Sequence, residues 1–167
     1  MSNFKEIVTK AVVGKGRLTT TEEYSTTSSN NPSTILGCWV INHKFEGEKD
    51  GDSVKVNGSF DVNIWYSKND NTETEVIKET VKYSDIIPIT LLDDYDGQNE
   101  IIVRVIKQPN CTKAQVSQDG TIIYTIEKTI AAELVGDTKI RIGLDSFEDV
   151  DNIEQEINNE TKENFLD

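Results

Sequence analysis

The clearest pattern in the chain is an alternation of apolar and polar residues between positions 54 and 66. Successive side chains of a β-strand point to opposite faces, so this alternation predicts a strand with one buried face. The opposite face carries Asp61, Asn63 and Trp65. The residues expected in the core are Val54, Val56, Phe60, Val62, Ile64 and Tyr66.

Similar patterns predict strands along most of the chain before residue 145. A short helix over residues 3–10 is an alternative for the first of them. Residues 101–106 are expected to be buried on both faces, whereas Pro88 places residues 86–88 at a sheet edge because proline cannot donate to a ladder. The predicted strands cover residues 7–13, 35–45, 54–66, 72–83, 86–88 and 101–106, with hairpins over 115–124 and 129–144.

Glycine and polar residues mark the turns between these strands. Asp119–Gly120 predicts a two-residue hairpin turn with positive φ at both positions, and Gly136–Asp137 predicts a second hairpin. Gly14 and Gly16 are expected to end the first strand, and Thr19 to Ser33 is predicted to be an irregular surface loop. A count of about eight or nine strands favours an all-β fold, either an antiparallel β-sandwich or an open barrel.

The distribution of charge divides the chain into two parts. Residues 1–144 hold 21 acidic and 16 basic residues, and residues 145–167 hold nine acidic residues and one basic residue. The sequence therefore predicts a β-rich assembly domain over 1–144 and an acidic, helix-prone tail over 145–167.

Several apolar residues interrupt the acidic tail. Four of them have the spacing of one helical face, which predicts an amphipathic helix that needs a partner; an acidic tail that only increases solubility is the alternative. The candidate partner-binding residues are Phe147, Val150, Ile153, Ile157, Phe165 and Leu166.

Overall composition limits the classes of partner. The net charge is −13 and the sequence pI is about 4.5, which disfavours nucleic acid and anionic membranes because both would repel the protein. The lack of a long apolar run predicts a cytosolic protein without direct membrane insertion. Two cysteines are too few for a disulfide framework, so reduced thiols are expected.

The chain offers few groups for catalysis. His43 is the single histidine, and Cys38 lies five positions before it on a predicted strand. An odd separation places the two side chains on opposite faces unless a β-bulge intervenes, and a thiol beside Trp39 is usually a small buried hydrophobic group. We therefore predict no catalytic residues and no enzymatic activity.

No cofactor or metal ion is predicted. Two Cys and one His cannot complete a tetrahedral zinc site without carboxylates, and Gly14-Lys15-Gly16 does not have the spacing of a phosphate-binding loop. The turn Asp93 to Glu100 is rich in oxygen ligands, but Leu92 stands where an EF-hand needs an aspartate. Trp65 is a candidate surface-contact residue, or is covered by another strand or by the predicted loop.

Four segments of the chain resemble the outer spore-coat morphogenetic protein E (CotE) family of endospore-forming bacteria. These segments, in one order along the chain, are residues 6–17 (EIVTKAVVGKGR), 33–44 (STILGCWVINHK), 60–67 (FDVNIWYS) and 108–111 (QPNC). The resemblance covers residues 4–143. The family's better-known tails are longer and more densely acidic than residues 145–167.

The resemblance implies a non-enzymatic scaffold that is made in the mother-cell cytoplasm and deposited in the spore coat. It implies self-association into a homo-oligomer, recruitment by the coat-basement ATPase, and recruitment of other coat proteins through the acidic C-terminal region. The alternative from another class is a small β module that binds a glycan or calcium through Trp65 or the turn Asp93 to Glu100.

Overall fold

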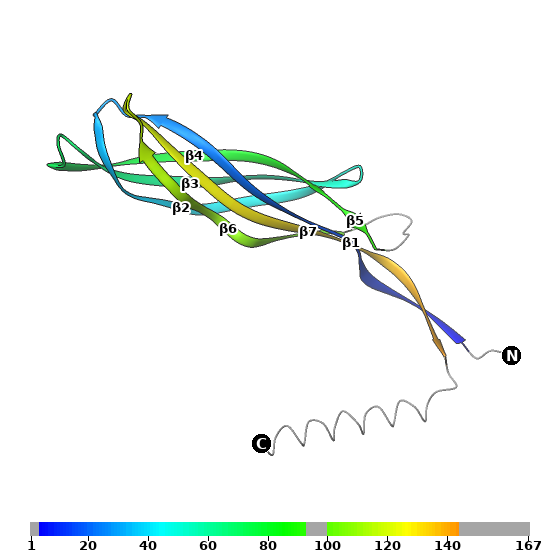
Figure 1. The fold of residues 1–167 in the computed structure, drawn as a ribbon. Coiled ribbons are helices and arrows are strands. Elements are labelled where there is room, and N and C mark those ends of the chain that lie inside the picture. The colour runs from blue at the N-terminus through cyan, green and yellow to red at the C-terminus, as the bar shows by residue number, and fades with distance from the viewer. Residues whose placement is uncertain (1–3, 93–99, 144–167) are drawn as a thin grey trace, which may run out of the picture. The chain divides into compact units, whose positions relative to one another are not determined.

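The computed structural model describes residues 4–92 and 100–143, and these form β-strands joined by short turns (Figure 1). The all-β prediction is confirmed. The strands are β1 (Phe4–Thr27), β2 (Pro32–Asp50), β3 (Ser53–Lys68), β4 (Glu73–Pro88), β5 (Thr90–Leu91), β6 (Glu100–Val116) and β7 (Thr121–Gly143).

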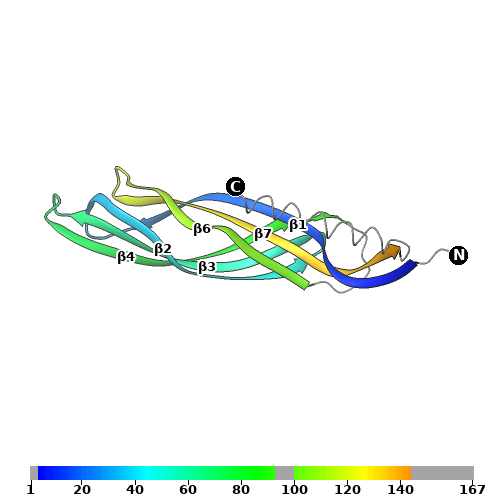
Figure 2. The same ribbon diagram turned by 90° about the horizontal axis from the view of Figure 1, so that it is seen from below.

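The strands form two antiparallel sheets, in the orders β5-β1-β7-β6 and β2-β3-β4. Within residues 12–136, which form one compact unit, the two sheets face each other as a sandwich (Figure 2). The predicted buried face of β3 is confirmed, because its six apolar residues are at most 1% exposed. They pack against apolar even-numbered side chains of β7, which are Ile122, Tyr124, Ile126, Ile130, Ala132 and Leu134.

The second unit combines residues 1–11 with residues 137–167. Its described part is a pair of hydrogen-bonded strand ends, from β1 and β7. Arg141 Nε lies 4.0 Å from Glu6 Oε1, and the Arg141 guanidinium lies 5.7 Å from the centre of the Phe4 ring. The predicted domain boundary between residues 144 and 145 falls outside the described residues and stays a prediction.

The predicted surface loop from Thr19 to Ser33 is wrong, because β1 runs on to Thr27. Leu18 and Tyr24 pack against the core, and Thr19 Oγ1 lies 2.9 Å from Thr129 Oγ1 of β7. The composition of the run was misleading: Thr is β-branched and suits the outer side of a strand as well as a loop. Glycines 14 and 16 do not end this strand either.

The hairpin predicted at Gly136–Asp137 is also wrong, because β7 continues through both residues to Gly143. Two long strands, β1 and β7, therefore replace several shorter predicted ones, and the described residues form seven strands. The hairpin at Asp119–Gly120 is confirmed, but only Gly120 has a positive φ, of 85°. The turn spans Ser117 to Gly120 and is closed by a hydrogen bond of 3.1 Å from Gly120 N to Ser117 O.

Two predictions about sheet edges had different outcomes. The edge position of residues 86–88 is confirmed, since β4 is the outermost strand of its sheet. The expectation that residues 101–106 are buried on both faces is wrong: β6 is also an edge strand, and Ile106 is 50% exposed.

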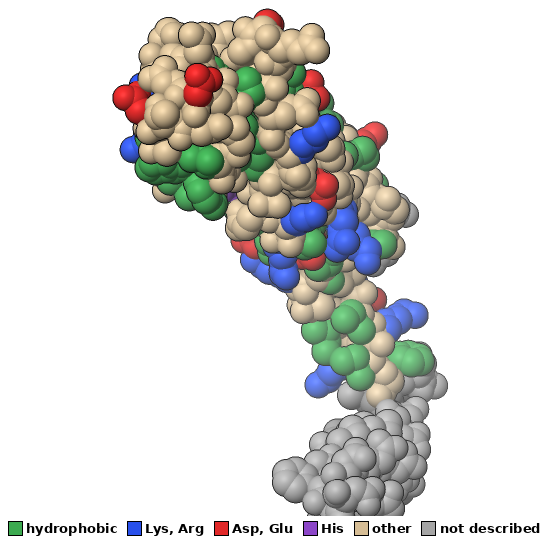
Figure 3. Space-filling view, turned by 60° about the vertical axis from the view of Figure 1, so that its left-hand side comes forward, with side chains coloured by type: hydrophobic (Ala, Val, Ile, Leu, Met, Phe, Trp, Pro, Cys, Tyr) green, Lys and Arg blue, Asp and Glu red, His purple; other side chains and the backbone are tan. Residues whose placement is uncertain are grey.

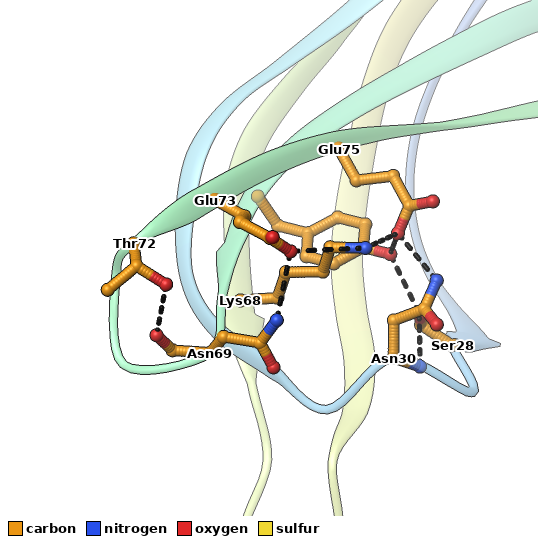
Figure 4. Close-up of polar contacts among 8 residues, drawn as sticks. Ser28, Asn30, Lys68, Asn69, Thr72, Glu73 and Glu75 are labelled. Atoms are coloured by element: carbon orange, nitrogen blue, oxygen red, sulfur yellow. Dashed lines mark hydrogen bonds and ion pairs between the residues drawn. The ribbon is translucent and has the colours of Figure 1, made fainter.

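A polar network ties together the turns at one end of the sandwich (Figure 4). Glu75 Oε2 accepts hydrogen bonds from the Tyr66 hydroxyl at 2.5 Å and from Asn30 Nδ2 at 2.6 Å. These bonds stabilise the ionised carboxylate and lower the pKa of Glu75. Lys68 Nζ lies 3.5 Å from the same oxygen, so the network fixes the β1–β2 turn against the β3–β4 hairpin.

Candidate functional site

Exposed aromatic and aliphatic side chains gather on the outer face of the three-stranded sheet. Trp39 is 53% exposed and Trp65 is 41% exposed. Ile41 shares this face, because its register partner Asp61 points outward like Trp65. We call Trp39, Ile41 and Trp65, with the exposed bulge residue Leu36, the tryptophan face.

Register and a glycine together bring the two tryptophans to adjacent positions. Gly37 pairs with Trp65 across β2 and β3. A Cβ atom at Gly37 would lie 2.2 Å from the Trp39 indole, so that ring lies directly over Gly37 and beside the strand position of Trp65. Exposed apolar patches of this kind mark contact surfaces in soluble proteins.

The sequence pointed to Trp65 but missed Trp39. Of the two alternatives for Trp65, the structure supports exposure, since no strand and no loop covers the side chain in the described residues. In the sequence, Trp39 stands out only as a neighbour of Cys38, and no orientation is predicted for it. Only the pairing of Trp39 with Asn63, an outward position of β3, shows which way it points.

A polar cavity of about 320 Å³ lies next to the tryptophan face, lined partly by Ile41, Asn63 and Lys78. Asp61 accepts hydrogen bonds from Asn42 Nδ2 at 2.9 Å and from Thr80 Oγ1 at 2.7 Å. These two bonds lower the pKa of Asp61. The cavity thus offers an oriented carboxylate and an amide, and Asn63 is the register partner of Trp39.

A second polar group lies between the two sheets and is largely buried. Lys128 is 2% exposed and Asp85 is 7% exposed, and Lys128 Nζ lies 3.0 Å from Asp85 Oδ2. The same ammonium donates to Thr20 Oγ1 at 2.8 Å and lies 4.2 Å from the centre of the Tyr83 ring. These contacts join β7 to β4 and β1, which is a structural role.

His43 extends this network to the edge strands. Its Nε2 lies 2.5 Å from the Tyr83 hydroxyl and its Nδ1 lies 3.1 Å from Gln108 Oε1. Burial and the charge of Lys128 lower the pKa of His43, while burial and Asp85 raise the pKa of Tyr83 to about 12. A neutral His43 therefore accepts from Tyr83 and donates to Gln108.

The bulge that the sequence left open is present in β2. The register shifts between Ile41 and Lys44, and Asn42 has a φ of 56°. Cys38 and His43 thus both pack on the inner side, yet Cys38 interacts with Cys111 and not with the imidazole. Burial and Cys111 raise the pKa of Cys38, which keeps it a thiol.

The family model described as outer spore coat protein E (CotE) matches residues 3–167. The chain belongs to the CotE family. No curated protein and no solved structure matches it. Membership of this family supports a role as a spore coat protein. The tryptophan face is therefore a surface of a coat protein.

Other predicted features of this CotE-family chain lie partly outside the described residues. The tail residues from Phe147 to Leu166 fall there, as do residues 93–99 of the candidate calcium turn. Within residues 4–92 and 100–143, no cluster of three or more His, Cys, Asp or Glu side chains is placed to hold a metal ion. The same ranges contain no helix long and apolar enough to cross a membrane.

Proposed function

We propose that this chain is a non-enzymatic structural protein of the spore coat that self-associates and recruits other coat proteins during sporulation. Family membership supports the coat role. The tryptophan face supports self-association: two indoles that are 53% and 41% exposed lie side by side on the outer face of the three-stranded sheet. Burying such anchors against a second copy removes a large apolar area from water.

The proposal includes a sequence of locations and partners. The protein is made in the mother-cell cytoplasm, is recruited by the coat-basement ATPase and becomes part of the coat. The acidic tail offers its six apolar residues to coat proteins. Alanine at Phe147, Val150, Ile153, Ile157, Phe165 and Leu166 should then remove coat proteins from pull-downs of the full chain, and unchanged co-purification would contradict this role.

Light scattering after size exclusion tests self-association through the tryptophan face. Full-length wild-type protein should form species larger than a dimer as its concentration rises. Trp39→Ser with Trp65→Ser should shift the midpoint of assembly to at least tenfold higher concentration. Ile86→Ser is the matched control, since Ile86 is 54% exposed on the same sheet but pairs with Lys55, far along β3 from Trp65.

Glycan binding is a second candidate function, favoured by the polar cavity beside the tryptophan face. Indole rings stack on sugar rings, and Asp61 and Asn63 present hydrogen-bonding groups at the same place. A glycan that binds there should raise the melting temperature of the wild-type protein and leave that of Trp39→Ser unchanged. Absence of any shift across a glycan panel, with assembly intact, would leave the scaffold function alone.

A further inference from the structure

A groove of about 630 Å³ lies on the outer side of the four-stranded sheet, within residues 12–136. Ala131 of β7 is one of the residues that line it. Arg104 is the register partner of Ala131 on β6, and Lys15 and Arg17 are outward residues of β1 on the other side of β7. The adjacent strands β1, β7 and β6 therefore line the groove, together with Thr90 of β5 and Leu92.

The groove combines positive charge with apolar surface. Lys15, Arg17 and Arg104 line it together with Ile106 and Leu92, which are 50% and 54% exposed. Among the described residues that line the groove, Glu133 is the one acidic residue, and its Oε2 lies 3.7 Å from Arg104 Nη2. Lys15 and Arg17 form no ion pair within the described residues. Lys and Arg side chains also gather beside hydrophobic ones in the middle of the face shown in Figure 3.

This positive groove contrasts with the rest of the chain. The net charge is −13, and the most acidic segment is residues 145–167, with nine acidic residues and one basic residue. That segment also carries apolar residues at intervals of three and four, from Phe147 to Ile157. Its alternation of carboxylates and apolar side chains matches the alternation of basic and apolar groups in the groove.

We propose that this groove binds the acidic C-terminal segment, residues 145–167, of a second copy of the chain. The inference rests on the proposed function only in taking another copy as the partner. A groove on one copy and a segment on the next form a heterologous contact, which propagates assembly instead of closing a dimer. The tryptophan face and the groove then act as two separate contacts.

Binding of a labelled synthetic peptide of residues 145–167 to the full-length protein tests the groove. Fluorescence anisotropy should show binding that weakens as salt rises. Lys15→Glu with Arg17→Glu should weaken it at least tenfold. Lys82→Glu with Lys113→Glu is the control with the same change of charge, because both lysines are exposed and lie outside the groove. Equal losses in the two variants, or none in the first, would overturn the proposal.

Two further measurements address specificity and the partner copy. A peptide of the same composition with its apolar residues shuffled should bind at least fivefold more weakly, and equal binding would overturn the groove as the site.

A photo-crosslinking phenylalanine at Ala131 in isotope-labelled full-length protein, mixed with unlabelled protein, should capture residues 145–167 of the unlabelled copy. If every crosslink joins two segments of the same labelled chain, the partner is not a second copy. If the wild-type protein does not bind the peptide but still assembles through the tryptophan face, this inference alone is overturned.

Discussion

At the scale of single residues, the His43 network makes the stability of the sandwich depend on pH. Burial and Lys128 lower the pKa of His43 from its ordinary value of 6.5, so the unfolded chain binds a proton more readily than the folded one. Stability is therefore fully present above pH 6.5 and falls as the pH drops below it. Asp61 and Glu75 also have lowered pKa values, but they titrate below this range.

Urea denaturation between pH 5.5 and 7.5 should show this loss in the wild-type protein. His43→Gln, which cannot titrate, should flatten the profile across the same range. An unchanged slope in the variant would mean that His43 does not set the dependence.

The ion pair of Lys128 and Asp85 predicts a larger effect. Lys128→Met leaves the carboxylate of Asp85 buried without its partner, and a change of this kind costs about 3–5 kcal/mol of unfolding free energy. Replacing both residues, as Lys128→Met with Asp85→Leu, should recover most of that loss because no unpaired charge remains. Chemical denaturation measures both. If the single and double variants are equally destabilised, the loss does not come from an unpaired charge on Asp85.

At the scale of elements, Gly16 allows the end of β4 to approach β1 closely. A Cβ atom at Gly16 would lie 2.1 Å from the carbonyl oxygen of Pro88, which is backbone and cannot rotate away. Gly16→Ala should therefore destabilise the sandwich by about 1–3 kcal/mol, as overpacking does. Gly143→Ala is the control, since a Cβ there meets nothing nearer than 3.7 Å. Equal melting temperatures for the two variants would show that the end of β4 can shift without cost.

Some of the strands could be predicted from the sequence and others could not. The period of two in β3 predicted both of its faces correctly. In this strand the apolar residues alternate with polar ones, so the pattern alone shows which side chains are buried. The length of β1 was not predictable from Thr19 to Thr27, since polar β-branched residues fit a loop and an exposed strand equally well. The turn predicted at Gly136 failed because that glycine is buried in a continuing strand.

The candidate site was predictable only in part. Trp65 was identified from its own strand, whereas Trp39 and the basic groove depend on which strands become neighbours. Arg104 lies far from Lys15 and Arg17 in the sequence, and only the strand order β1-β7-β6 brings it into the same groove. That order cannot be derived from periodicity, which specifies faces and not neighbours.

At the scale of the whole molecule, the tryptophan face makes assembly visible to a simple spectroscopic probe. The chain has two tryptophans, and both belong to this face. Their emission therefore reports directly on whether the face becomes covered.

The most direct test of the proposed scaffold is tryptophan emission, measured with light scattering on full-length protein across one concentration series. We expect the emission maximum to move to shorter wavelength and acrylamide quenching to fall in step with the rise in mass, because assembly removes both indoles from water. A rise in mass with emission and quenching unchanged would contradict the tryptophan face as the contact. A constant monomer mass at every concentration would contradict self-association itself.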